Sequence, residues 1–463
     1  MSDRIWGWTA SIYVAACLLL GGASAAGAAA NGVLQILALV LLVVLAWVRT
    51  GRAYPSGARP LILIVGAFLL WVLVQLAPLP QGLWTALPGR DAAAAALTAI
   101  GAAPGAMPAS LAPIRTIESI LWLLPPAAVF FLVLRLPSKE RRRAAGAVIA
   151  VALVSVVLGA FQVMGGEDSP LRLYEITNPT SPVGFFSNKN HLATLLLCTL
   201  PLAAALAGRS AGESQGRARR HSARLVYGAV ALFVGIGVAI NGSMAGYALL
   251  LPAGFASVLI YRRAVTGRVS MRALAGLGAL LIAFIGVSAF GPLSSEALST
   301  KFASEPASRK VLTMRTLEAA GSYFPVGSGL GTFQQVYRTY EDPAEATRQF
   351  ANHAHNDYAE VALELGLPGV LLVLLFILWW ARRSLAAWRE SFSGAALARA
   401  SSVMIGVVLF HSIVDYPLRT SAIGALFAAA CALLLASPVA QSRGRRGQDP
   451  AAGESGARHL QAD

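Results

Sequence analysis

The sequence is short of charge and of cysteine. Only 13% of its 463 residues are charged, whereas an average soluble domain carries about 25%. Hydrophobic residues make up 56% of the chain, which excludes a disordered protein and disfavours an ordinary soluble enzyme. The three cysteines, Cys17, Cys198 and Cys431, all lie inside apolar stretches. Neither a disulfide framework nor a cysteine metal cluster is therefore expected.

Two signatures of nucleotide-dependent enzymes are missing. No Asp-x-Asp pair occurs in the chain, so a metal-dependent nucleotide-sugar transferase site has no support. The Gly-rich segment 325–331 lacks the following Lys-Ser/Thr of a P-loop, so no ATP site is expected. His353-x-His355-x-Asp357 has a spacing that occurs in metal sites, but short polar runs often match it by chance. Neither a metal nor a cofactor is therefore expected.

Long apolar runs are abundant. A bilayer core needs roughly 20 mostly apolar residues per helix. The sequence predicts an all-α polytopic membrane protein with about 12 transmembrane helices, at about 6–27, 31–48, 60–80, 117–136, 145–164, 190–208, 225–241, 244–261, 273–291, 357–381, 400–416 and 418–437. The Ala-rich stretch Ala23 to Ala30 also resembles a signal-peptide cleavage region, and its removal would leave the later topology unchanged.

The net charge of +15 would suggest a nucleic-acid partner if the protein were soluble. The basic residues instead gather in alternate loops, while the long loops between them are close to neutral. The positive-inside rule makes these basic loops and both termini cytoplasmic, and no nucleic acid is expected. The basic loops are 49–59, 135–144, 209–224, 262–272 and 382–399.

The loop lengths predict how the chain is organised. Two extracytoplasmic loops, 165–190 and 292–356, are too long to be simple connectors. The second is a large loop between helices 9 and 10, and its mixed composition predicts short helices on the membrane face. The expected units are therefore nine helices in 1–291, this loop, three helices in 357–437 and a disordered cytoplasmic tail in 438–463.

Ionisable residues gather at the extracytoplasmic face. Four of the six histidines, His191, His353, His355 and His411, map at or near it. Imidazole is a natural acid–base group near neutral pH, although four residues can also fall on one side by chance. The densest polar run is 352–358, which contains two of these histidines.

The polar run precedes a helix that carries Glu360 and Glu364 at membrane depth, on one helix face. Asn356 or Asp357 is suited to cap this helix, and a capping role does not exclude a catalytic one. The following stretch Gly366-Leu367-Pro368-Gly369 predicts a kink or break.

Other groups on this face are suited to bind a phosphate-containing substrate. Arginine binds phosphate through two parallel hydrogen bonds. A turn rich in Gly327, Gly329 and Gly331 would let backbone amides approach a phosphate, although a plain turn fits it better. His411 and Asp415 are four apart and would pair on one helix face, in a catalytic or a purely structural network. The candidate binding residues are Asn188, Asn190, His353 and Arg419, with Arg309, Lys310, Arg315, Arg338 and Arg348 in the large loop.

These motifs resemble a known family. His355-Asn356, nine residues and then Gly366-x-x-Gly369 resembles the signature of bacterial O-antigen ligases and of the wider superfamily with O-antigen polymerases and protein O-oligosaccharyltransferases. Arg309 and the segment 325–333 resemble the large periplasmic loop of that family, and 184–190 resembles its Gly-Thr-Phe-x-Asn-x-Asn stretch. Twelve spans with a large loop after the ninth also match.

The resemblance implies an inverting, metal-independent glycosyltransferase of the bacterial inner membrane. It would transfer a glycan from undecaprenyl pyrophosphate to a lipid A–core sugar hydroxyl at the periplasmic face. His355, with Asn356, would carry the catalysis, and Arg309 or Arg315 would hold the pyrophosphate. The glycines of both motifs would be structural.

One position departs from the family pattern. Ligases often carry Ser-Arg at the outer turn between spans seven and eight, and this chain has Met244 where the Arg is expected. The departure puts one phosphate contact and the acceptor in doubt, with Arg172 or Arg419 as replacements. The alternatives are an O-antigen or exopolysaccharide polymerase, a protein O-oligosaccharyltransferase and, from another class, a transporter, although no half repeat supports transport.

Overall fold

The computed structural model describes residues 2–24, 28–48, 55, 57–102, 105–212, 216–268, 270–290, 309–341, 351–390 and 394–435. The predicted tail 438–463 and two parts of the predicted large loop, 292–308 and 342–350, lie outside these residues. The elements are α1 (Asp3–Leu20), α2 (Ala28–Trp47), α3 (Ala58–Leu76), β1 (Pro78–Leu79), α4 (Gln81–Thr85), α5 (Asp91–Ala99), β2 (Met107–Pro108), α6 (Pro113–Leu121), α7 (Leu124–Arg135), α8 (Ser138–Met164), α9 (Lys189–Gly212), α10 (Arg217–Asn241), α11 (Met244–Thr266), α12 (Met271–Phe290), α14 (Arg309–Ser322), α15 (Phe333–Tyr337), α16 (Asp357–Arg389), α17 (Ala395–His411), the 3-10 helix η2 (Pro417–Arg419) and α18 (Ser421–Leu434).

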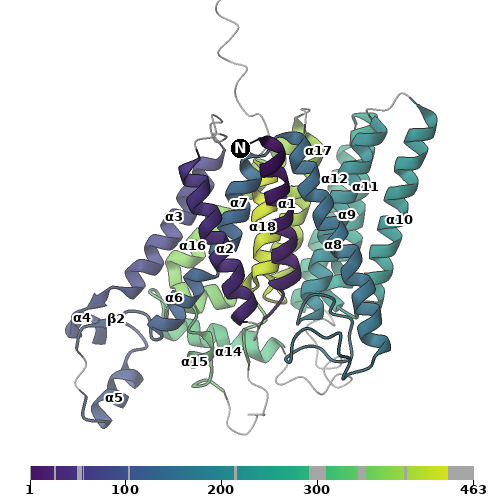
Figure 1. Cartoon of the computed structure of the whole chain (residues 1–463). Helices are drawn as coiled ribbons and strands as arrows, with labels where there is room; N and C mark the ends of the chain where they lie inside the picture. Colours follow the sequence, from purple (N-terminus) through teal and green to yellow (C-terminus); the bar gives the residue numbers. More distant parts are fainter. Residues whose placement is uncertain are drawn as a thin grey trace, which may run out of the picture.

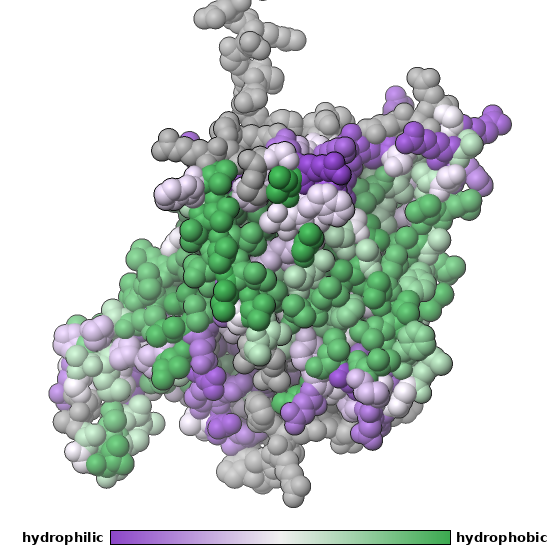
Figure 2. All heavy atoms as spheres, in the orientation of Figure 1, coloured by the Kyte–Doolittle hydropathy of each residue, from purple (hydrophilic) through white to green (hydrophobic). Residues whose placement is uncertain are grey.

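The prediction of an all-helical membrane protein is confirmed. A helix lies in each predicted apolar run. Among the described residues, eight helical stretches are long and apolar enough to cross a membrane, and α17 and α18 are shorter apolar helices. Hydrophobic side chains cover the middle of the molecule, and hydrophilic ones gather toward its two ends (Figure 2). The chain is therefore a multi-pass membrane protein.

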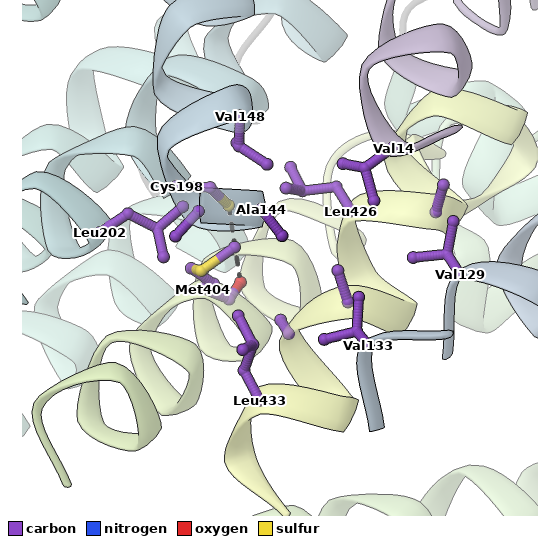
Figure 3. Close-up of a cluster of buried hydrophobic side chains, with 14 of the residues drawn as sticks. Val14, Val129, Val133, Ala144, Val148, Cys198, Leu202, Met404, Leu426 and Leu433 are labelled. Atoms are coloured by element: carbon purple, nitrogen blue, oxygen red, sulfur yellow. Dashed lines mark hydrogen bonds between the residues drawn. The ribbon is translucent and has the colours of Figure 1, made fainter. Parts of the chain in front are cut away.

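The bundle is built around α9. Of its membrane-length window, 89% is buried, a larger share than in any other described span. It packs against α8, α10, α11 and α17. Side chains of the neighbouring core interlock around Cys198 of α9, whose thiol lies 3.8 Å from the backbone oxygen of Met404 (Figure 3). The polar segment 184–190 leads into α9, so the packing of this buried helix fixes the position of that segment.

Three elements differ from the simple picture of one helix per run. The run predicted at 117–136 is divided into α6 and α7, because Pro125 and Pro126 lie in the first turn of a new helix. The residues from Pro78 to Ala112 form a small lobe with the antiparallel pair β1–β2 and two short helices, at one side of the bundle (Figure 1). The described part of the predicted large loop contains the short helices α14 and α15.

The kink predicted in α16 is confirmed. Gly366 has φ 61° and ψ −149°, a conformation that L side chains rarely adopt, and Pro368 follows it. The α14–α15 segment lies at the end of the bundle opposite the N-terminus (Figure 1), and this end is called the outer end. The first part of α16, from Asp357 to Leu365, therefore lies at the outer end, and its direction differs from that of the rest of the helix.

Candidate active site

The outer end brings together four segments that are far apart in the sequence. They are the start of α9, the helix α14, the residues around the start of α16, and the turn from Ser412 to Arg419 between α17 and α18.

His355 is paired with Asp415. Nδ1 of His355 lies 3.1 Å from Oδ1 of Asp415, and the side chains are 22% and 0% exposed. The amide of Asn188 donates to the other carboxylate oxygen at 3.4 Å. Burial alone would raise the pKa of the Asp415 carboxyl, but the hydrogen bond from His355 and the charges of His355 and Arg309 hold that pKa well below its usual range. An ionised Asp415 directs the proton of His355 to Nδ1 and leaves Nε2 as the basic nitrogen.

The backbone around His355 is fixed on both sides. His355 has φ 51°, the one positive φ among the described non-glycine residues. Asn356 caps α16, since its side-chain oxygen accepts from the amides of Tyr358 and Ala359 at 3.0 Å each. The amide of Asp357 donates to the backbone oxygen of Ser412 at 3.0 Å. The cap therefore holds His355 at the point where the chain enters the helix.

His353 forms a second imidazole–carboxylate pair. Its Nδ1 lies 2.8 Å from Oε1 of Glu360, and its side chain is 18% exposed. The amide of Ala354 donates to the other oxygen of Glu360 at 3.0 Å. His353 and His355 thus both present a carboxylate-oriented imidazole that is partly open to solvent.

Arg419 lies among three carboxylates of α16. Its guanidinium is 2.9 Å from Glu364, 3.4 Å from Glu360 and 3.5 Å from Asp357, and its side chain is 17% exposed. The predicted shared face of the two glutamates is thereby confirmed. These contacts engage the guanidinium, so they compete with the predicted contact between Arg419 and a pyrophosphate.

The Gly-rich turn is packed against the kink of α16. The amides of Ser328 and Gly329 donate to the backbone oxygens of Leu363 and Glu364 at 2.9 Å each. The amide of Leu330 donates to the side chain of Gln75 at 3.2 Å. A Cβ on Gly327 would lie 2.5 Å from the oxygen of Glu364. The turn uses these amides within the protein, and its glycines allow two backbones to touch.

The other predicted binding residues lie around this centre. Nη1 of Arg309 donates to the backbone oxygen of Val414, beside Asp415, at 3.4 Å. Arg315 lies further along α14 and is half-buried. Asn190 accepts from the hydroxyl of Ser243 at 2.7 Å, next to the departing position Met244. Gly369 lies within the helical part of α16 after the kink.

One predicted pairing is wrong. His411 and Asp415 were expected to pair on one helix face, but α17 ends at His411, so Asp415 lies beyond the helix. Nδ1 of His411 instead lies 2.8 Å from the hydroxyl of Thr194, and Asp415 pairs with His355. Arg172 is engaged by backbone oxygens of its own loop, including those of Asn178 and Ser181 at 3.1 Å.

One contact of the centre was missed at the sequence level. The side-chain amide of Asn352 donates to the hydroxyl of Tyr416 at 3.2 Å, and no local spacing marks a bond between residues 64 positions apart. Within the described residues, no group of three or more His, Cys, Asp or Glu side chains is arranged to hold a metal ion. His353, His355 and Asp357 each turn to a different partner.

Comparisons with known proteins give one family. Residues 229–374 match the family model described as O-antigen ligase, and this range includes both imidazole–carboxylate histidines and the kink. No curated protein matches the chain. A chain from the structure described as "Structural coordination of polymerization and crosslinking by a peptidoglycan synthase complex" aligns with 16% identity over 83% of this chain and 97% of that chain, with a TM-score of 0.39. Residues 229–374 are therefore similar to the O-antigen ligase family.

Proposed function

We propose that the protein is an O-antigen ligase-like glycosyltransferase. It transfers a glycan from undecaprenyl pyrophosphate to a sugar hydroxyl of lipid A–core at the periplasmic face of the inner membrane. The family match supports a membrane glycosyltransferase with a lipid-linked donor and an acceptor in the membrane. The carrier lipid, the acceptor, inversion and metal independence belong to the proposal.

The observation that carries the proposal is the pair of His355 and Asp415. In the proposed reaction, Nε2 of His355 takes the proton of the acceptor hydroxyl as its oxygen attacks the anomeric carbon of the donor sugar. The bond between that carbon and the phosphate oxygen breaks, and its electron pair leaves with the pyrophosphate. Asp415 stabilises the imidazolium that forms, since its carboxylate faces Nδ1 at 3.1 Å. One attack on the opposite side inverts the anomeric centre.

Arg309 is the proposed partner of the leaving pyrophosphate. Fixed cations stabilise the negative charge that develops on a leaving phosphate. Arg309 reaches the turn that carries Asp415 through the oxygen of Val414, and it is half-buried at the outer end. Arg315 on the same helix is the second candidate. Arg419 is assigned instead to ordering α16, because three carboxylates surround it.

The topology supports the same assignment. The N-terminal end of α1 and the basic stretch at the start of α8 lie at the end of the bundle opposite the site. If basic loops are cytoplasmic, the outer end faces the periplasm. A lipid-linked glycan would then present its sugar to the site while its tail stays in the bilayer.

The test is an in-frame His355→Ala substitution, with His221→Ala as the control on the opposite side. Lipopolysaccharide from a deletion strain that carries each variant is separated on a silver-stained gel. His355→Ala is expected to give bare lipid A–core, with long glycan accumulating on the carrier lipid, while His221→Ala restores capping. Lipopolysaccharide that is still capped in an expressed His355→Ala strain would contradict the proposal.

The same gel separates ligase from polymerase. Loss of a ligase leaves bare core, whereas loss of a polymerase leaves core with single repeat units. Retained glycan transfer by the purified protein in detergent, where no gradient exists, would eliminate a transport-only role. An unchanged lipopolysaccharide together with lost glycosylation of a periplasmic protein would indicate a protein O-oligosaccharyltransferase.

A further inference from the structure

Tyr416 lies at the meeting point of three histidines. Its ring centroid is 4.4 Å from that of His353, 4.9 Å from that of His355 and 5.3 Å from that of His191. The residue follows Asp415 directly and is only 4% exposed. The two rings that are partly open to solvent therefore share one buried aromatic neighbour.

The hydroxyl of Tyr416 is held as well. It accepts from the side-chain amide of Asn352 at 3.2 Å. Burial, and then the charge of Asp415, raise the pKa of Tyr416 to about 12, so the phenol stays neutral at physiological pH. Neutral Tyr416 adds no charge beside the two carboxylates, and its contribution is the shape and position of its ring.

A single hydrogen bond does not fix an imidazole. His353 and His355 are each tied at Nδ1, to Glu360 and Asp415 respectively. Such a bond sets one distance but allows the ring to rotate about it, which would swing Nε2 away from a substrate. A packed ring on the side of each imidazole removes that rotation, and an edge-to-face contact such as that of His355 is itself favourable. His355 stands at 76° to Tyr416, and His353 at 39°.

We infer that Tyr416 is a positioning residue whose ring fixes the orientation of both His353 and His355 toward one substrate. The inference rests on the proposed function, because it needs His355 to act as the base. The ring of Tyr416 then keeps the two imidazoles at a fixed distance from each other. His355 would contact the hydroxyl of the acceptor, and His353 would contact a second polar group on the bound donor. Misplacing a catalytic group by 1 Å costs on the order of 100-fold in rate.

The experiment compares Tyr416→Phe, which keeps the ring, with Tyr416→Leu, which removes it. Tyr358→Leu is the matched control, because Tyr358 lies nearby at the start of α16 and its hydroxyl donates to a backbone oxygen, that of Leu409 at 2.7 Å. Each purified protein is assayed in detergent with donor lipid and bare lipid A–core extracted from the deletion strain. Thermal unfolding of each variant is measured in the same detergent.

Tyr416→Leu is expected to lower kcat by about 100-fold with a donor KM within about threefold of wild type. Tyr416→Phe is expected to keep at least about a third of wild-type kcat, because the ring contacts remain. Tyr358→Leu is expected to lower the unfolding midpoint as much as Tyr416→Leu does while keeping its kcat. Equal kcat losses in the two Leu variants would reduce Tyr416 to a structural role and overturn the inference.

A double variant with Asp415→Asn gives a second readout. If the ring acts through the pose of His355, the loss in kcat for Tyr416→Leu with Asp415→Asn is much smaller than the product of the two single losses. Independent effects that multiply would overturn the inference. Full activity of His355→Ala, by contrast, would remove the proposed function itself, so the two failures are distinguishable.

Discussion

Gly366 and Pro325 are in direct backbone contact. The amide of Leu367 donates to the oxygen of Pro325 at 2.9 Å, and a Cβ built on Gly366 would lie 2.1 Å from that oxygen. The Gly-rich turn and the kink of α16 therefore fit each other because Gly327 and Gly366, which face the opposite backbone, have no side chain. The arrangement also explains why Glu364, two residues before the kink, accepts from the amide of Phe333 at 3.2 Å.

Gly366→Ala is expected to disrupt the outer end. The left-handed backbone costs about 1–3 kcal/mol for a non-glycine residue, and the clash with a backbone oxygen adds to it. Glycan transfer should fall at least about tenfold, and the unfolding midpoint in detergent should drop. The control is Gly254→Ala in α11, where a Cβ would meet nothing within 4 Å. A Gly366→Ala protein as stable and active as the control would contradict the proposed fit.

Arg419→Gln is expected to destabilise the protein strongly. It would leave Asp357, Glu360 and Glu364 buried together without their cation, and breaking a buried ion pair costs roughly 3–5 kcal/mol. Arg115→Gln is the control, since its pair with Glu118 is 55% and 49% exposed and is worth about 1 kcal/mol or less. Thermal unfolding in detergent measures both. Similar midpoints for the two variants would show that the carboxylates do not depend on Arg419.

Part of this architecture follows from sequence alone. Apolar runs predict the transmembrane helices because the thickness of the bilayer sets the length of such a run. The kink in α16 is predicted by Gly366 and Pro368. The pairing of His355 with Asp415 does not follow, because the two residues are 60 positions apart and belong to different elements. Local periodicity pairs Asp415 with His411 instead, and it fails because α17 stops at His411.

Other contacts that the sequence does not predict are hydrogen bonds between residues far apart in the chain. Arg90 is fully buried and donates to the backbone oxygens of Ala109 and Gly327, which binds the lobe from Pro78 to Ala112 to the Gly-rich turn. Gln75 bonds to the backbone oxygen of Glu364 at 2.9 Å. Nothing in the sequence around Arg90 or Gln75 marks these partners, since a backbone oxygen is available at every position.

Asn356 is expected to act through its cap. Asn356→Ala should cost about 1 kcal/mol of stability and reduce transfer, because the cap orients the strained residue before it. Asn356→Asp keeps the acceptor oxygen for Tyr358 and Ala359 and should restore both stability and transfer. Thermal unfolding and the glycan-transfer assay give the two readings. An Asn356→Asp protein that is stable but inactive would instead indicate that the amide touches the substrate.

Asp415 should make stability depend on pH in a defined direction. Its pKa in the folded protein is well below the ordinary value, so its contribution is fully present above the unfolded pKa of about 3.9. That contribution is lost as the pH falls through the folded pKa. The midpoint difference between wild type and Asp415→Asn should therefore be constant from about pH 5 to 8 and shrink below about pH 4.

Asp168→Asn, on an exposed loop residue, provides the control for that pH series and should leave the unfolding midpoint unchanged throughout. Wild type should exceed Asp415→Asn at neutral pH, because the variant leaves His355 without its carboxylate and Asn188 without a charged acceptor. A difference that grows as the pH falls would mean that Asp415 is protonated in the folded protein. His355 would then lack the negative partner that the proposed base requires, and its orientation would depend on the ring of Tyr416 alone.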